Sequence, residues 1–151
     1  MKVLGYRGIG LVSKAIRFQT RSDYSHVALE TSTGEVFEAW HIGGVRKLRN
    51  FREGHHAGTE VDVFTPILPI KESEAVEFLT TQVGKDYDFR SVFRFLSRRD
   101  APEDGKWFCS ELVMVVFNKF AVPLLNLSPW AASPRDVCIS PILTRGERRT
   151  V

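Results

Sequence analysis

The sequence predicts an α+β domain built on a mostly antiparallel sheet. Segments with the alternating pattern of β-strands gather in the first half of the chain, and helix-type segments lie before and after them. The chain has 151 residues, of which 43% are hydrophobic, and this suffices for one ordinary core but not for two. We therefore expect residues 1–151 to form a single domain.

The N-terminal part of the chain predicts a strand, a helix and a hairpin. Residues 3–6 are short and apolar enough for a strand. After Gly10, helical spacing indicates a short amphipathic helix that ends before Ser22. Its periodic positions are Leu11, Val12, Ala15, Ile16 and Gln19. Residues 25–30 and 35–40 both alternate as strands do, and they are expected to pair as a hairpin.

The middle of the chain predicts a loop, a strand and a helix. Residues 43–58 are rich in Gly, His and Arg and are expected to form a loop with one edge strand at most. Residues 59–64 alternate as another strand. Ser73 is expected to cap a helix that ends at Gly84.

The C-terminal third predicts little regular structure after one further helix. Residues 128–141 are punctuated by prolines and are expected to wrap as coil. Arg145, Arg148 and Arg149 form a basic cluster, which is expected to be solvated surface or a frayed tail.

The charge balance narrows the classes of partner. The 21 basic and 18 acidic residues give a net charge of +3 without a long basic stripe, so charge alone does not suggest binding to nucleic acid or to a membrane surface. No run approaches the roughly 18 apolar residues of a membrane span, and no stable membrane insertion is expected. The first residues show no apolar h-region and no small-residue cleavage site, so no export signal is expected. We expect a cytoplasmic protein as synthesised, with delivery elsewhere by another system left open.

Cys109 opens the most strongly predicted helix, which is expected to run to about Phe120. Cys109, Val113, Val116 and Phe120 share one helix face, which must bury against the sheet. At a helix start the dipole and the free backbone N–H groups stabilise a thiolate, which lowers the thiol pKa, and they can donate to an oxyanion. The alternative is that Cys109 is a small buried hydrophobe. Cys138 is the better candidate for an inert, reduced cysteine.

His26 and Glu38 are the candidate base and its orienting partner, provided that the hairpin has the right register. If residues 32–34 form a three-residue loop with glycine at the left-handed position, Thr31 pairs with Glu35. Glu38 then lies diagonal to His26 on the same face, within reach of its side chain. A two-residue loop would shift the register by one and turn Glu38 to the opposite face.

Other histidines leave alternatives open. His41 follows the second hairpin strand, and His55 and His56 lie in the predicted loop, so each is an alternative base. Histidines outside regular structure can also indicate a metal site. The chain has no HExxH motif and no paired CxxC spacing, so no metal site is expected.

Four blocks of the chain resemble the circularly permuted NlpC-type branch of the papain-like cysteine hydrolases, and in particular its YiiX-like group. The blocks are YSHVAL at 24–29, VFEA at 36–39, GKDYDF at 84–89 and WFCSELV at 107–113. Residues 133–136 and 140–141 resemble the C-terminal tail of that group. The order histidine, polar partner, cysteine matches the permuted branch, whereas papain itself has the cysteine first.

The resemblance implies a permuted papain-like fold with the nucleophile helix packed against the sheet. It assigns Cys109 as nucleophile, His26 as general base and Glu38 as the orienting residue, and it implies that Tyr87 and Tyr24 contact substrate. It requires no metal or organic cofactor. The implied function is a cysteine amidase or peptidase that acts through an acyl-thioester on a small amide or peptide, cell-wall fragments included. A thioesterase or acyltransferase on a lipid and a non-catalytic binding module remain as alternatives.

Overall fold

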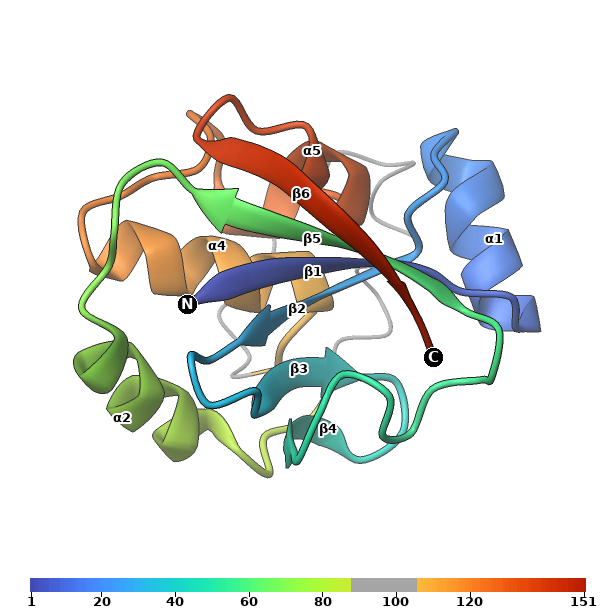
Figure 1. Cartoon of the computed structure of the whole chain (residues 1–151), viewed down its shortest axis with the longest axis horizontal. Coiled ribbons are helices and arrows are strands. Elements are labelled where there is room, and N and C mark those ends of the chain that lie inside the picture. Colours follow the sequence, from blue (N-terminus) through green and yellow to red (C-terminus); the bar gives the residue numbers. More distant parts are fainter. Residues whose placement is uncertain (88–105) are drawn as a thin grey trace.

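The computed structural model describes residues 1–87 and 106–151, and in this part of the chain six strands form one sheet. Every neighbouring pair is antiparallel. Figure 1 shows the sheet, whose spatial order is β4 Gly44–Leu48, β3 Val36–Trp40, β2 His26–Glu30, β1 Lys2–Arg7, β5 Glu60–Pro66 and β6 Leu143–Thr150. The predicted α+β class with an antiparallel sheet is confirmed.

The helices differ in how closely they pack on the sheet. They are α1 Leu11–Thr20, α2 Glu72–Gln82, α4 Cys109–Lys119, the short α5 Pro134–Cys138 and a 3-10 turn at Pro129–Ala131. Helix α4 lies against β2 and β3 and makes the main layer behind the sheet (Figure 1). Among the described helices, none combines the length and the apolarity that crossing a bilayer requires.

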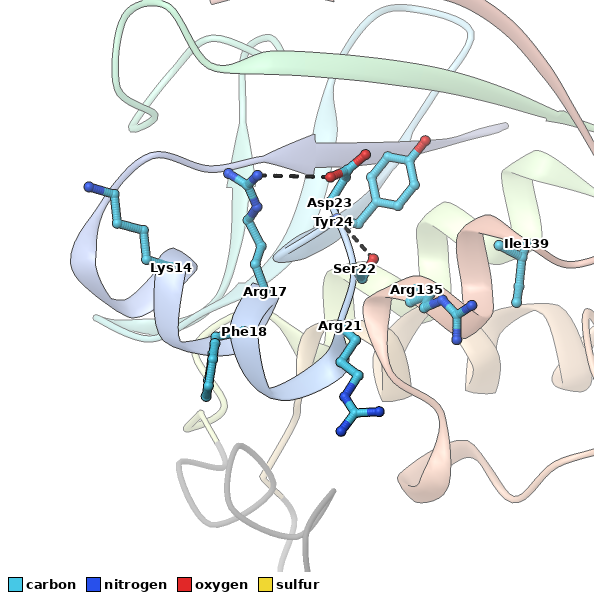
Figure 2. Close-up of a pocket in the computed structure, with 9 residues that line it drawn as sticks. All are labelled: Lys14, Arg17, Phe18, Arg21, Ser22, Asp23, Tyr24, Arg135 and Ile139. Carbon is cyan, nitrogen blue, oxygen red and sulfur yellow. Dashed lines mark hydrogen bonds and ion pairs between the residues drawn. The ribbon is translucent and has the colours of Figure 1, made fainter.

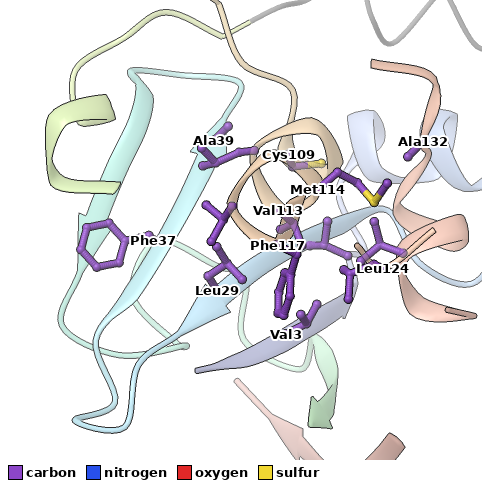
Figure 3. Close-up of a cluster of buried hydrophobic side chains, with 14 of the residues drawn as sticks. Val3, Leu29, Phe37, Ala39, Cys109, Val113, Met114, Phe117, Leu124 and Ala132 are labelled. Atoms are coloured by element: carbon purple, nitrogen blue, oxygen red, sulfur yellow. The ribbon is translucent and has the colours of Figure 1, made fainter. Parts of the chain in front are cut away.

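Two hydrophobic cores lie on the two faces of the sheet. The larger joins alternate strand residues such as Val27 and Leu29 to the buried side of α4, where Val113 and Phe117 lie. Figure 3 shows this packing around α4, with Cys109, Val113 and Phe117 beside Leu29 of β2. The smaller core covers the opposite face and includes Ala28. Successive residues of β2 therefore point into different cores, as strand geometry requires.

The sequence predictions for the C-terminal third are wrong in two respects. The segment that was expected to be coil contains α5, in which Ser133 caps the helix through its bond with Asp136. The basic cluster was expected to be solvated surface or a frayed tail. Arg145 and Arg148 are exposed, but the cluster is not a tail, because it lies in β6, which pairs with β5. Charged side chains hide this strand from an apolar pattern, but they suit an edge strand, where charge discourages further pairing.

One smaller prediction about helices also needs correction. Helix α2 begins at Glu72 with Lys71 before it, so Ser73 lies inside the helix and is not the cap. Gly84 follows the end of α2 with φ of +88°, as a helix-ending glycine does. The predicted helix α1 is confirmed. Of its residues only Ile16 is buried, whereas Leu11 and Phe18 are exposed.

The two edges of the sheet are covered in different ways. Along β4, the N–H of Val45 donates to the carbonyl of Lys85 and the N–H of Gly84 donates to the carbonyl of Val45, both at 2.8 Å. Gly44 has φ of +71°, and a Cβ there would overlap the carbonyl oxygen of Lys85. Only glycine therefore lets the segment before Tyr87 lie along this edge. The other edge is the charged strand β6.

Candidate active site

The β2–β3 hairpin has the register that the sequence predicted. Leu29 pairs with Phe37, and the N–H of Thr31 donates to the carbonyl of Glu35 at 2.9 Å. The loop is therefore residues 32–34, and Gly34 has the left-handed φ of +87° that a three-residue loop needs. This register turns His26 and Glu38 to the same face of the hairpin.

His26 and Glu38 are joined by a short hydrogen bond where the two strands separate. The ladder between β2 and β3 contains only the pairs Leu29–Phe37 and Glu30–Val36, so it does not reach the first residues of β2. Beyond it, Nε2 of His26 lies 2.6 Å from Oε2 of Glu38, and both residues are buried. Nδ1 of His26 has no hydrogen-bond partner among the described residues, so it is the ring nitrogen left for another group.

Glu38 is held on both carboxylate oxygens. Nε of Arg46, which lies opposite Glu38 on β4, donates to Oε1 at 2.8 Å. Nε2 of His55 lies 3.1 Å from Oε2, the oxygen that also meets His26. Burial by itself would raise the pKa of Glu38, but the contact with His26 and the hydrogen bonds from both histidines outweigh it. The pKa of Glu38 lies well below its ordinary value, and the group is a carboxylate.

Burial sets the protonation state of His26. Removal from water lowers its pKa below the ordinary value, and the nearby His55 and Arg46 act in the same direction, while Glu38 opposes them. The imidazole is therefore neutral near pH 7. With Nε2–H donating to Glu38, Nδ1 carries the lone pair that a general base needs.

Aromatic rings fix the two histidines in place. Tyr6 stacks on His55 with ring centroids 4.1 Å apart. Trp40 meets His26 edge-on at 5.1 Å and His55 edge-on at 4.9 Å. The hydroxyl of Tyr6 donates to the carbonyl of Phe51, which ties the strand to the loop that carries His55. These contacts keep the rings from rotating and exclude water from the Glu38 carboxylate.

His55 was not singled out by the sequence beyond its place among alternative bases. It lies in the turn-rich segment between β4 and β5, where no periodicity indicates which way a side chain points. Its side chain is only 4% exposed, and its ring touches Tyr6, His26 and Trp40. His41 and His56 are not bonded to Glu38 in the structure. His55 differs from them in its bond to Glu38 and in its stacking on Tyr6, and both contacts join segments that are distant in the chain.

Cys109 is the first residue of α4 and is 1% exposed. Its neighbours in the larger core include Ala39 and Val113 (Figure 3). Burial raises the pKa of the thiol to about 12, although hydrogen bonds from the backbone N–H groups of Val27, Ser110 and Cys109 itself lower it. The expected N–H donors are therefore present, but the expectation of a lowered thiol pKa is wrong for this conformation because desolvation outweighs them.

The thiol and the imidazole approach β2 from different sides. Val27 points into the core with α4, whereas the ring of His26 lies against Tyr6 on the other face. The Val27 N–H that bonds the thiol belongs to the peptide that directly follows His26. No hydrogen bond joins Sγ of Cys109 to the His26 ring in the described structure. The fold thus brings Cys109 to the His26–Val27 peptide without closing a thiol–imidazole contact.

A small enclosed cavity of about 20 Å³ lies beside His26, which is room for about one water molecule. It is lined by Val12, Ser13, Ile16, Ser25, His26, Ala39, Trp40, His41 and Tyr87. Tyr87 is therefore close to the candidate site. Tyr24 is not among the lining residues, and its hydroxyl donates to Asp62 at 2.6 Å instead.

His26, Glu38 and His55 also form a group that could hold a metal ion. Their ligand atoms all lie within 4.8 Å of one another, and two histidines with one carboxylate are a common ligand set for transition metals. The guanidinium of Arg46 on the same carboxylate places a fixed positive charge beside any cation there. The ligand types fit a metal, and the neighbouring charge opposes it.

Comparison with known proteins shows the fold. No family model matches the chain, and no curated protein matches it. Among solved structures, the crystal structure of the metalloprotein YiiX from Escherichia coli O157:H7 is similar with a TM-score of 0.66, over 98% of this chain and 96% of that one. The two sequences are 21% identical. The chain has a YiiX-like fold.

Proposed function

We propose that this protein is a cysteine hydrolase that transfers an acyl group to Cys109 and then to water. The observation that carries the proposal is the 2.6 Å bond between His26 and Glu38 next to the helix that Cys109 opens. The YiiX-like fold and the order His26, Glu38, Cys109 along the chain support a permuted papain-like arrangement. The substrate is a small amide or peptide, and a lipid ester or thioester is the alternative.

The chain's residues divide the reaction between them. Nδ1 of His26 takes the proton from Cys109 as the thiolate attacks the substrate carbonyl carbon. The N–H groups at the start of α4 donate to the oxyanion that forms. His26 returns the proton to the leaving amine or alkoxide, and the thioester remains on Sγ. Water then attacks with His26 as base, the carboxylic acid leaves, and the thiol is restored. Glu38 holds the imidazole in the Nδ1-free tautomer throughout.

The buried thiol defines a resting state. With the pKa of Cys109 raised to about 12 and that of His26 lowered, both groups are neutral at pH 7. Ionisation therefore requires that the site admit water or substrate, which removes the desolvation that raises the thiol pKa. The hydrogen bonds from the backbone N–H groups of Val27 and Ser110 then lower the pKa of the thiol without desolvation to oppose them.

The first experiment measures alkylation of Cys109 by iodoacetamide between pH 4 and pH 9, in a Cys138→Ser background so that one thiol reports. Because burial raises the pKa of Cys109 to about 12 in the resting state, the rate in the parent chain should still be rising at pH 9. His26→Gln should slow the reaction at pH 7 by about a hundredfold, in line with the loss of a general base. Intact-mass spectrometry gives the rates.

The matched control is His56→Gln, which removes an exposed histidine one residue from His55. It should leave the profile of Cys109 unchanged. Equal rates in His26→Gln, His56→Gln and the parent chain would overturn the hydrolase proposal. In that case the site would be a binding module that retains the fold.

A divalent metal at His26, Glu38 and His55 is the second candidate function. The three ligand atoms favour it, and the similar YiiX structure is that of a metalloprotein. Bound zinc would occupy Nε2 of His26 and would break its bond with Glu38, so the two functions exclude each other in one molecule. Isothermal titration with zinc, with His55→Gln as the test variant and His56→Gln as control, decides between them. Equal zinc affinity in both variants would exclude this site.

A further inference from the structure

Helix α1 carries an apolar surface that no described element covers. Leu11 and Phe18 are seven residues apart, which is close to two full turns, so they lie on the same side of the helix. Their exposed fractions are 86% and 88%. Val12 and the preceding Ile9 are also exposed. Large apolar residues of this kind on a solvent-facing side indicate an interaction surface when they are contiguous.

The same helix borders a cationic groove. The groove, about 740 Å³ in volume, lies between α1 and α5 and is lined by Lys14, Arg17, Phe18, Arg21, Ser22, Asp23, Tyr24, Arg135 and Ile139. Figure 2 shows Phe18 of α1 and Arg21, which directly follows α1, projecting toward the same side, with Arg135 on the neighbouring helix. Four of the lining residues are cations and one is an acid. Ile139, at the far end of the groove, is 58% exposed.

Three of the four cations have no acidic partner among residues 1–87 and 106–151. Asp23, the one acidic residue in the lining, binds Arg7 at 2.9 Å and lies 3.9 Å from Arg17. Lys14, Arg21 and Arg135 make no ion pair with any of the described acidic residues. Within the part of the chain that the structure describes, the groove is therefore a cationic site with little neutralising charge, and exposed apolar side chains flank it.

We propose that this surface, made of Leu11, Phe18, Lys14, Arg21 and Arg135, docks on an anionic phospholipid membrane. Apolar side chains beside cations match the boundary between acyl chains and phosphate headgroups, where one helix face lies in the interface plane. A second copy of the chain fits less well, because a symmetric contact would place the same cations against each other. A nucleic acid would satisfy the cations but would leave Leu11 and Phe18 in water.

Docking of α1 on a membrane would also place the candidate active site close to the membrane, because α1 borders that site. Val12 and Ile16 line the small cavity beside His26, so the helix that would lie on the membrane is also a wall of the candidate active site. If the hydrolase proposal holds, this arrangement favours the lipid alternative for the substrate. Vesicle binding itself does not depend on Cys109, so the two proposals can fail separately.

The experiment is co-sedimentation of the full chain with vesicles of phosphatidylcholine alone and of equal parts phosphatidylcholine and phosphatidylglycerol. The chain should bind the anionic vesicles and bind them less at high salt. The double variant Arg21→Gln, Arg135→Gln should bind about 25-fold more weakly, at about fivefold per cation. The double variant Leu11→Ser, Phe18→Ser should lose at least about tenfold.

Matched variants on other surfaces serve as controls. Arg49→Gln with Lys71→Gln removes the same charge, and Ile67→Ser with Leu68→Ser removes two apolar side chains that are 57% and 52% exposed. Both should bind like the parent chain. Absence of binding to anionic vesicles at low salt overturns the proposal. So does binding that soluble glycerol phosphate abolishes, or binding that falls as much in the control variants as in the test variants.

The apolar variant also distinguishes a membrane from a soluble acidic partner. If charge removal weakens binding and Leu11→Ser with Phe18→Ser leaves it unchanged, the surface recognises charge alone and the membrane proposal is wrong. Because both side chains are exposed, this variant should keep the parent melting temperature. Melting curves therefore show whether weaker binding comes from the altered surface or from unfolding of the variant.

Discussion

Two carboxylates, Glu38 and Asp62, are similarly buried but have different hydrogen-bond partners. Glu38 meets His26, His55 and Arg46. Asp62 is fully buried and accepts hydrogen bonds from three arginines and a tyrosine, which are Arg7, Arg145, Arg148 and Tyr24. In both cases burial opposes ionisation, hydrogen bonds outweigh it, and the pKa lies well below its ordinary value.

The difference lies in what the partners can do. Arginine keeps its proton at any physiological pH, so the charges around Asp62 are fixed and the cluster ties β1, β5 and β6 together. Tyr24 belongs to it, and its pKa is raised to about 12 by burial and by its bond to Asp62. Histidine changes charge near neutral pH. The Asp62 cluster is therefore suited to structure, and the Glu38 cluster to proton transfer.

The largest effect on stability is expected for Asp62→Asn. Removing the anion leaves three arginines facing one another around a buried amide, which should cost about 3–5 kcal/mol in the free energy of unfolding. Urea denaturation measures this cost. The alkylation profile of Cys109 in the folded variant should stay that of the parent chain. A cost below about 1 kcal/mol would mean that the arginines are held by solvent and not by Asp62.

Glu38→Gln should have the opposite pattern: a smaller loss of stability than Asp62→Asn and a large loss in the alkylation rate of Cys109. The amide keeps the shape and leaves one cation, Arg46, without its partner, so the expected stability loss is about 1–3 kcal/mol. The imidazole of His26 loses the acceptor that fixes its tautomer, and alkylation of Cys109 at pH 7 should slow by about a hundredfold or more. A stability loss without a change in alkylation would make Glu38 a second structural carboxylate.

The pH dependence of folding should come chiefly from His26, between about pH 6.5 and pH 5. His26 is neutral in the folded state because its pKa is lowered, whereas the unfolded chain takes up a proton near pH 6.5. Stability should therefore be complete above about pH 6.5 and fall below it, by at most about 1.4 kcal/mol per pH unit for this one group. Asp62, with its lowered pKa, loses its contribution only in the acid range below about pH 4.

The variant His26→Gln checks this assignment. It should flatten the decrease in the free energy of unfolding between pH 6.5 and pH 5, measured by urea denaturation at several pH values. The pKa of His41 is also lowered, chiefly by burial, so a smaller slope of the same sign should remain. An unchanged slope in His26→Gln would place the titration elsewhere.

The smallest effect is expected for His55→Gln. The ring makes one bond to Glu38 and stacks on Tyr6, so its loss should cost about 0.5–1.5 kcal/mol. His56→Gln, its exposed neighbour, should cost nothing measurable. If His55→Gln slows alkylation as strongly as Glu38→Gln does, His55 shares the positioning of the carboxylate with His26.

The sequence was sufficient for the parts of the site that local geometry determines. Gly34 at a left-handed position sets a three-residue loop, and the period of two along each strand then places Glu38 diagonal to His26. The spacing of Cys109 and Val113 predicted the buried face of α4 in the same way. Each of these inferences needs only the chain within one element or one hairpin.

The features that the sequence did not predict depend on contacts between distant segments of the chain. His55 reaches Glu38 because its loop folds back onto Tyr6, and no local pattern encodes that path. The strand β6 exists because its arginines reach Asp62, a partner 83 and 86 residues away. The thiol pKa of Cys109 depends on how completely the core closes over it. Periodicity in α1 showed which residues share a face, but not that the face with Leu11 stays open.

The covering of the two sheet edges limits how a peptide could bind. Proteins often hold an extended peptide by adding it as a strand to an open edge. Here Gly44 lets the backbone of Gly84 and Lys85 occupy the β4 edge, and the opposite edge is a strand crowded with charge. A peptide substrate would have to be selected by its side chains and its scissile carbonyl, and the same covering protects the fold against edge-to-edge association in concentrated solution.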